Sequence, residues 1–132
     1  MRRKSINPLG ETELEVLHII WDLGEATVAE VREQILRDRK VAYTTVMTVT
    51  RNLADKGYLS FKSRGNSYVY SAKLQAEDVR KSILREMVES VFKGSPLALV
   101  QTLTGDDELT DEEVEEIKSI INSMNRGEED HD

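Results

Sequence analysis

The sequence predicts a mainly α-helical protein with one small β-hairpin. Apolar residues recur at the helical spacing of three and four along most of the chain, whereas segment 58–71 consists of short β-like runs. The 132 residues include no cysteine and two histidines, so disulfides, thiolate metal sites and a histidine metal cage within one chain are not expected. No cofactor is predicted. The chain also lacks a glycine-rich phosphate loop and a nucleophile elbow, so no enzymatic activity is expected.

Three short helices are predicted before the hairpin. The first runs from about Glu11 to Leu23, with acidic residues in its opening turns, where the helix dipole favours them. The second opens with the capping-box pattern Thr-Val-Ala-Glu at 27–30 and runs to about Arg37. Its inward-facing residues are expected to be Val28, Val31, Ile35 and Leu36.

The third predicted helix has an unusual composition and stops before Gly57. Four threonines occur within seven residues, 44–50, although β-branched threonine is a mediocre helix former. One face carries the stripe Val46, Val49, Thr50 and Leu53. A surface of short hydroxyls with an arginine suits close approach to a DNA groove. The candidate contact residues on the outer face are Thr44, Thr45, Thr48, Arg51 and Asn52.

The segment after Gly57 is predicted to be a β-hairpin. Its two runs, 58–63 and 67–71, flank the turn signal Arg64-Gly65-Asn66. Three helices followed by a hairpin form the layout of a winged helix-turn-helix domain, in which the hairpin is the wing. A hairpin that only covers the core is the alternative, a role that suits Tyr68 and Tyr70. The candidate residues for contacts of the wing region with the DNA backbone are Lys40, Tyr43, Lys62, Arg64 and Asn66.

Charge is distributed unevenly along the chain, whose net charge is −7. Residues 39–75 carry seven basic groups and one acidic group, whereas residues 76–132 carry six basic and 16 acidic groups. Because salt screens charges over roughly 8–10 Å, the local charge matters more than the total. A basic segment over the third helix and the hairpin is expected of a phosphate-binding surface. An ordinary solvated face is the alternative.

Residues 76–124 are predicted to form three amphipathic helices. The first ends near Gly94, the second starts at Pro96, and the third opens with a capping-box pattern at 110–113. Such large apolar stripes predict packing against a second copy, in a two-fold homodimer. The alternative is that these helices fold back on the first domain of their own chain. The candidate dimerisation residues are Val79, Ile83, Met87, Val91, Phe92, Leu99, Leu103, Val114, Ile117 and Ile121.

The predicted organisation has four parts. A flexible basic arm, 1–9, precedes a winged helix-turn-helix DNA-binding domain at 10–75, a helical dimerisation region at 76–124 and a disordered acidic tail at 125–132. No run of about 18 apolar residues occurs, so no membrane span is expected. A cytoplasmic location is the default expectation.

An ordered set of motifs resembles the penicillinase and methicillin-resistance repressors (BlaI/MecI type). It comprises Leu14-Glu15-Val16 with Trp21, Ala26-Thr27-Val28, Tyr43-Thr44-Thr45-Val46-Met47-Thr48 with Arg51, Tyr68-Val69-Tyr70 and Phe92-Lys93-Gly94-Ser95. The resemblance implies a homodimeric winged-helix repressor whose DNA partner is a pseudo-palindromic operator. It also implies that the third helix enters the major groove through Thr44, Thr45, Thr48 and Arg51.

The sequence departs from the family pattern in two ways. Copper-responsive relatives end in a cysteine-rich motif, which this chain lacks. The β-lactam-responsive relatives are cleaved at an Asn-Phe bond before the last helix, and the corresponding stretch 101–104, Gln-Thr-Leu-Thr, has no such bond. A sensor protease or an inducer is the further partner class to which the resemblance points, and the sequence identifies neither.

Two other functions fit the sequence. One is a winged-helix protein-interaction module without DNA binding, in which the acidic helices dock a partner. The other is a ligand-responsive repressor with a small-molecule pocket between its domains. The basic segment coincides with the threonine face and the hairpin, and this coincidence favours DNA binding over a pure interaction module.

Overall fold

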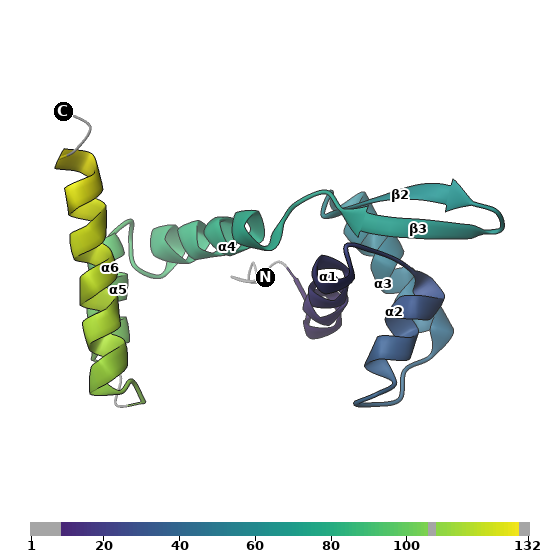
Figure 1. Cartoon of the computed structure of the whole chain (residues 1–132), viewed down its shortest axis with the longest axis horizontal. Coiled ribbons are helices and arrows are strands. Elements are labelled where there is room, and N and C mark those ends of the chain that lie inside the picture. Colours follow the sequence, from purple (N-terminus) through teal and green to yellow (C-terminus); the bar gives the residue numbers. More distant parts are fainter. Residues whose placement is uncertain (1–8, 106–107, 130–132) are drawn as a thin grey trace, which may run out of the picture. The chain divides into compact units, whose positions relative to one another are not determined.

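The computed structural model describes residues 9–105 and 108–129 (Figure 1). The predicted basic arm, apart from Leu9, and residues 130–132 of the predicted tail lie outside these ranges. The chain divides into two compact units, one reaching to Glu86 and the other starting at Met87. The predicted fold class, mainly helical with a small hairpin, is confirmed.

The first unit contains three helices, a three-stranded sheet and most of a fourth helix. All three predicted helices are confirmed, with ends that differ from the predicted ones by at most two residues. The strand β1 was not predicted, because it is three residues long and its last residue, Thr27, is also the N-cap of α2. The elements are α1 (Glu11–Leu23), β1 (Glu25–Thr27), α2 (Val28–Ile35), α3 (Tyr43–Asp55), β2 (Leu59–Arg64), β3 (Ser67–Ala72) and α4 (Ala76–Ser90).

The sheet is antiparallel, with the order β1-β3-β2. The predicted hairpin turn is confirmed: β2 and β3 flank Gly65 and Asn66, and Gly65 has a φ of 62°, which glycine adopts without steric cost. Tyr70 at the centre of the sheet pairs with Ala26 of β1 and with Phe61 of β2. β3 is therefore paired on both sides at the base of the hairpin, with β1 on one side and β2 on the other.

The core of the first unit lies between α1, α2, α3 and the base of the sheet. Thr50 is its one buried polar residue among those described, and its Oγ1 donates to the carbonyl of Met47 at 2.9 Å, so burial leaves no unsatisfied hydroxyl. Leu36 was wrongly predicted to face inward. It follows the last residue of α2 and is exposed, because Val28, Val31 and Ile35 already occupy the inner face. The largest buried side chains are Leu17, Ile20, Ile35, Leu53 and Leu59.

The first unit extends past residue 75, the predicted end of the DNA-binding domain. Val79 of α4 is 3% exposed and belongs to the core, and Ile83 packs against it. The indole Nε1 of Trp21 in α1 donates to the carbonyl of Leu74 at 3.0 Å, which fixes the chain just before α4. Val79 is thus used within its own chain and is not available to a second copy.

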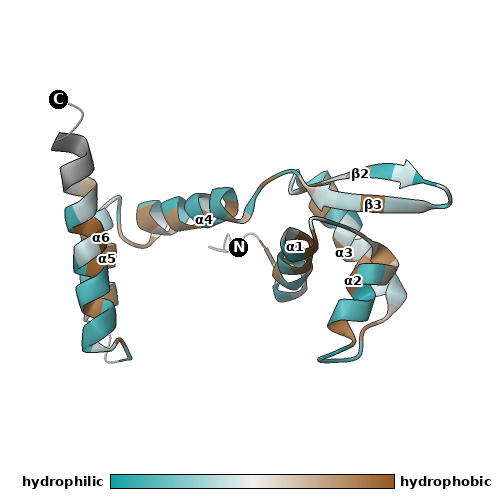
Figure 2. Ribbon diagram, in the orientation of Figure 1, coloured by the Kyte–Doolittle hydropathy of each residue, from teal (hydrophilic) through white to brown (hydrophobic). Residues whose placement is uncertain are grey.

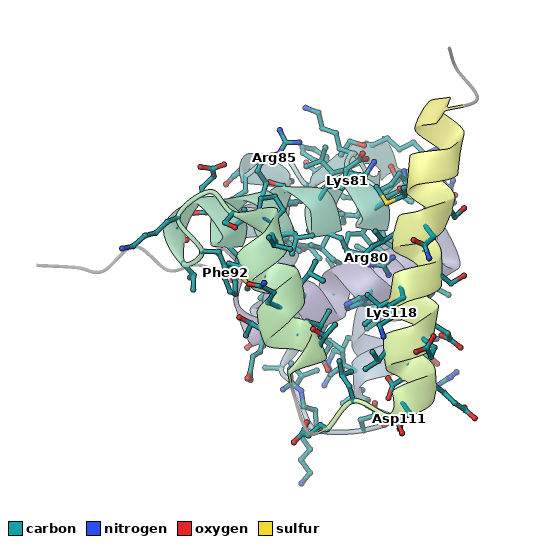
Figure 3. All side chains as sticks on the ribbon, turned by 90° about the vertical axis from the view of Figure 1, so that its left-hand side faces the viewer. Arg80, Lys81, Arg85, Phe92, Asp111 and Lys118 are labelled. Atoms are coloured by element: carbon teal, nitrogen blue, oxygen red, sulfur yellow. The ribbon has the colours of Figure 1, made fainter. Side chains whose placement is uncertain are left out.

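The second unit consists of residues 87–90 of α4, then α5 (Pro96–Thr104) and α6 (Asp111–Glu129). The capping box predicted for α6 is present: Thr110 N–H donates to Glu113 Oε1 at 3.0 Å, and Glu113 N–H donates to Thr110 Oγ1 at 3.1 Å. Figure 3 shows Asp111 in the first turn of α6 and Lys118 further along it. The helix continues to Glu129, past the predicted end at Met124, because an exposed helix end needs no apolar residue to extend.

In the second unit, none of residues 87–105 and 108–124 is buried. Figure 2 shows hydrophobic residues along α5 and α6. The exposed fraction is 66% for Leu97, 61% for Ile120 and 65% for Met124. These helices therefore lack a core of their own. Among the helices of residues 9–105 and 108–129, none combines the length and the apolar composition that a membrane span requires.

Candidate nucleic-acid interface

The outer face of α3 is entirely solvent-exposed. Val46, Thr50 and Leu53 point into the core, and this anchoring leaves the opposite side of the helix free. The exposed predicted contact residues on this face are Thr44, Thr45, Thr48, Arg51 and Asn52. Hydroxyl, guanidinium and amide groups are all groups that hydrogen-bond to base edges or phosphates in DNA complexes.

The N-terminus of α3 differs from those of α1 and α2. The Glu13 carboxylate accepts the N–H of Gly10 at 2.9 Å, and the Glu30 carboxylate accepts the N–H of Thr27 at 3.0 Å. Among the described residues, α3 has neither an acidic side chain in its first turn nor a side-chain cap at Ala42. The positive end of its dipole is thus left uncompensated, a local field that favours an anion.

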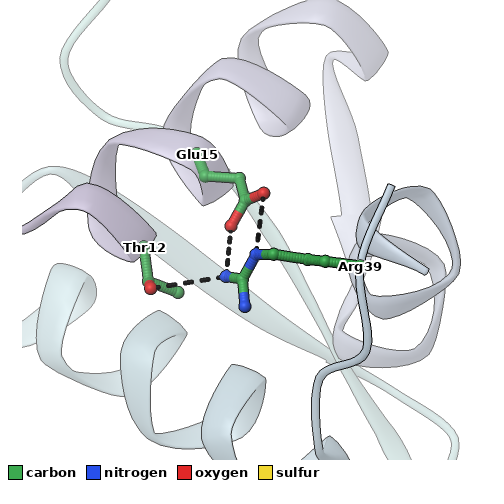
Figure 4. Close-up of polar contacts among 3 residues, drawn as sticks. All are labelled: Thr12, Glu15 and Arg39. Atoms are coloured by element: carbon green, nitrogen blue, oxygen red, sulfur yellow. Dashed lines mark hydrogen bonds and ion pairs between the residues drawn. The ribbon is translucent and has the colours of Figure 1, made fainter. Parts of the chain in front are cut away.

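Hydrogen bonds to α1 hold α3 at its start. Arg39, in the loop before α3, donates to both carboxylate oxygens of Glu15, from Nη2 at 2.6 Å and from Nε at 3.4 Å (Figure 4). Nη2 also lies 3.5 Å from Thr12 Oγ1. The hydrogen bonds to Glu15 raise the pKa of the Arg39 guanidinium. Arg32 Nε donates to the carbonyl of Val41 at 3.0 Å, which fixes the same loop from α2.

A second ion pair with α1 holds α3 at its other end. Lys56, the C-cap residue, places Nζ 3.0 Å and 2.9 Å from the two carboxylate oxygens of Glu13. Each of these partly exposed pairs contributes little stability by itself, about 0–1 kcal/mol. Placed at both ends of the helix, they restrict how α3 tilts on α1.

An open cleft of about 440 Å³ separates α3 from the hairpin. Of the predicted contact residues, it brings together Tyr43, Arg51 and Asn66, whereas Thr44, Thr45, Thr48 and Asn52 do not line it. Sequence reasoning missed Met47 and Phe61, which line it as well. Period-two alternation along the hairpin places Phe61 on the face of Tyr68 and Tyr70, and could have identified Phe61.

The prediction that Tyr68 covers the core is wrong. Tyr68 pairs with Ser63 near the hairpin tip and is 54% exposed, whereas Tyr70, closer to the base, is 6% exposed. The rings of Phe61 and Tyr68 make an edge-to-face contact with centroids 5.1 Å apart. The hairpin reaches beyond the core, so an aromatic residue near its tip lines the cleft instead.

The predicted wing cations both contact one acidic residue. Lys62 Nζ lies 3.7 Å from Glu25 Oε2, and Arg64 Nη2 lies 3.3 Å from Glu25 Oε1. All three side chains are exposed, at 65%, 63% and 47%. Glu25 belongs to β1, the strand that was not predicted, so its role could not be inferred from the sequence.

The basic segment is largely compensated by charge within the fold. Four of its seven cations form ion pairs with acidic residues of α1 and β1, namely Arg39, Lys56, Lys62 and Arg64. Within the described part of the chain, Lys40, Arg51 and Lys73 form no ion pair with an acidic side chain. Residues 9–75 carry nine basic and nine acidic groups. Arg51 is therefore the uncompensated cation of the α3 face.

The predicted dimerisation residues vary in exposure. Val79 is buried and Ile83 packs on the core, as described above. Figure 3 labels Phe92, just beyond α4. The exposed members are Val91, Leu103 and Ile121, and the partly exposed members are Met87, Phe92, Leu99, Val114 and Ile117.

Among the described residues, no three or more His, Cys, Asp or Glu side chains are placed so that they could hold a metal ion.

Sequence and structure comparisons connect this chain to a group of repressors. The chain is 25% identical over 114 residues to the methicillin resistance regulatory protein MecI of Mammaliicoccus sciuri, covering 86% of this chain and 93% of that protein. It is 24% identical to the penicillinase repressor of Staphylococcus aureus, covering 86% and 90%. The solution structure of the DNA-binding domain of the repressor BlaI matches with a TM-score of 0.50 and 26% identity, covering 58% of this chain and 93% of that one. The family model "Penicillinase repressor" matches residues 9–123. The chain belongs to the penicillinase repressor family.

Proposed function

We propose that this protein is a sequence-specific DNA-binding transcriptional repressor that acts as a homodimer on pseudo-palindromic operators. The observation that carries the proposal is the face of α3, which is exposed, rich in hydroxyls and equipped with an unpaired arginine. Membership of a family whose model is described as a penicillinase repressor supports it. So does the similarity to the DNA-binding domain of the repressor BlaI.

In this proposal α3 enters the major groove. Arg51 reads a guanine through its two-pronged guanidinium, and Thr44, Thr45 and Thr48 donate to base edges or phosphates and offer methyl groups to thymine. The uncapped start of α3 faces a phosphate. Lys40, Tyr43, Asn66 and the wing cations position the protein on the backbone without reading sequence.

The second unit supplies the dimer contact. Its exposed apolar residues have no core to bury them, and a second copy of the same helices provides a self-complementary surface. A two-fold dimer presents two α3 helices, so its operator contains two inverted half-sites. The exposed residues assigned to this surface are Val91, Leu97, Leu103, Ile120, Ile121 and Met124.

Selection of bound duplexes from a random DNA pool with the full-length protein tests the proposal. The expected result is an enriched motif made of two inverted half-sites at a fixed spacing. Enrichment of no motif, together with no binding to any duplex at low salt, would contradict it. That outcome would favour the protein-interaction module.

A ligand-responsive repressor is a second candidate, and the cleft between α3 and the hairpin supports it. Its volume of about 440 Å³ falls in the range of small-molecule sites, and its lining includes the aromatic residues Phe61 and Tyr68 and the charged residues Arg51 and Asp55. Thermal-shift screening of planar aromatic carboxylates tests this candidate. A shift that Tyr68→Ala abolishes is expected, and a shift that persists in Tyr68→Ala contradicts a site in this cleft.

A further inference from the structure

We propose that Glu25 acts as an internal competitor of DNA phosphate for Lys62 and Arg64, and so lowers the affinity of the protein for every duplex. This inference rests on the proposed DNA-binding function. Glu25 carries the anion on β1, and the two cations lie on β2, on the opposite side of β3. Its effect concerns the strength of backbone contacts and not the choice of bases.

Strand register brings the three side chains onto one face of the sheet. Glu25 pairs with Ser71 of β3, which pairs in turn with Ser60 of β2, so Glu25 shares its face with Ser60. Lys62 and Arg64 follow Ser60 at the period-two spacing and lie on that face too. Glu25 reaches both cations across β3, with one carboxylate oxygen near each.

The carboxylate of Glu25 offers the wing cations the same kind of acceptor that a phosphate offers. While Lys62 or Arg64 is paired with Glu25, it must break that ion pair, or share its charge between Glu25 and a phosphate, to bind the DNA backbone. The separations of 3.3 Å and 3.7 Å and the exposure of all three side chains make this exchange easy. Glu25 therefore reduces the gain from each phosphate contact without blocking the contact.

The same competition changes how many ions are released when the protein binds DNA, and therefore how affinity depends on salt. Binding of Lys and Arg to DNA releases counterions and makes affinity fall with salt. When DNA takes Lys62 and Arg64 away from Glu25, the freed carboxylate takes up a cation from solution. Fewer ions are then released in total, so Glu25 makes the salt dependence shallower.

Neighbouring groups do not duplicate this effect. Glu30 interacts with Arg64 electrostatically but forms no ion pair with it, and one oxygen of its carboxylate accepts the N–H of Thr27. Arg51 on α3 forms no ion pair with a described acidic residue. Glu25 thus weakens the wing contacts with any duplex and leaves the proposed base-reading arginine unopposed, so overall affinity falls while the preference for the operator over other sequences is kept.

The test compares Glu25→Gln with Glu33→Gln in the full-length protein. Glu33 is exposed on α2 and forms no ion pair with a described residue, so its substitution controls for the change in net charge. Each protein is titrated against a labelled 30-base-pair duplex of arbitrary sequence and against the selected operator, at several KCl concentrations. We expect E25Q to bind both duplexes about threefold to tenfold more tightly than E33Q, the gain that loss of two exposed ion pairs allows. Its salt slope should be steeper by about one unit.

A double-mutant cycle separates this mechanism from general charge effects. In a K62Q/R64Q background, E25Q should give no more change than E33Q gives. Equal affinities of E25Q and E33Q in the otherwise unaltered protein, or an E25Q gain that persists in that background, would overturn the inference while leaving the proposed function intact. Absence of binding to both duplexes by the unaltered protein and by E25Q would overturn both. Glu25→Ser serves as a second variant if E25Q melts at a lower temperature.

Discussion

The two units of this chain differ in how they bury apolar surface. The first unit closes a core around Leu17, Leu53 and Leu59 and leaves a polar helix face outside. The second unit has helices of similar amphipathic character but no buried side chain among residues 87–105 and 108–124. The same pattern of apolar spacing thus produces a folded domain in one half and an open surface in the other.

This difference indicates a division of labour. A rigid first unit can hold α3 in one orientation, because its buried face and two ion pairs to α1 fix it. In the proposed dimer, the open second unit buries its apolar residues against another chain. In the proposed function, the first unit binds DNA and the second unit joins two such chains into a dimer.

The largest effect should come from the core of the first unit. Leu53→Ala removes a fully buried side chain of α3 and should reduce the free energy of unfolding by about 2–5 kcal/mol. Leu97→Ala on α5, where the side chain is 66% exposed, should leave the urea midpoint of the first unit unchanged. Equal losses of stability in the two variants would contradict the difference in burial between the two units.

The next effect concerns the open surface of the second unit. Ile120→Glu places a charge on the proposed dimer surface and should weaken the dimer by about 100-fold, the scale of a central interface residue. Ser119→Glu, one residue away on α6 and also exposed, is the matched control. Sedimentation velocity over a range of concentrations measures both. A monomer at all concentrations in the unaltered protein would refute the dimer.

A smaller effect is expected at the reading face of α3. Arg51→Ala and Thr48→Ala should each weaken operator binding by about 1–3 kcal/mol if they read bases. Arg51→Lys keeps the charge but loses the two-pronged donor, so it should recover only part of the loss. Fluorescence anisotropy with the selected duplex measures all three. Unchanged affinity in both Arg51→Ala and Thr48→Ala would contradict the proposal that α3 binds in the major groove.

The smallest effect is a pH dependence at the start of α2. Hydrogen bonds from Thr27, first from its backbone N–H, lower the pKa of Glu30 below its ordinary value of 4.5. A carboxylate with a lowered pKa stabilises the fold above its unfolded pKa, and this contribution is lost as the pH falls through the folded value. The stability difference between the unaltered protein and Glu30→Ala should therefore be largest near neutral pH and shrink below about pH 4.5. Urea unfolding across that range measures it, and a constant difference would contradict this assignment.

Much of the first unit could be predicted from the sequence, because its signals are local. Glycine ends α1, the Thr27–Glu30 pair caps α2, and the apolar stripe of α3 selects the buried face. The strand β1 could not be predicted, since three residues have no period of their own and pair with β3 from a distance. The same limitation hid the contacts of Glu25.

The candidate site was predictable in its residues but less so in its electrostatics. The exposed face of α3 follows from helical spacing. The net charge of the basic segment did not reveal that Glu13 and Glu15 of α1 lie against its cations, because such pairs form only after folding. The apparent charge of +6 along residues 39–75 therefore overstates the positive surface.

One measurement tests the link between the two units most directly. The affinity of the full-length protein for the selected duplex is compared with its affinity for the same duplex with one half-site scrambled. If the second unit joins two DNA-binding units in one dimer, losing one half-site should weaken binding by about 10²–10⁴-fold. Ile120→Glu should remove most of that difference. Equal affinity for the two duplexes in the unaltered protein would contradict a homodimer that reads two inverted half-sites.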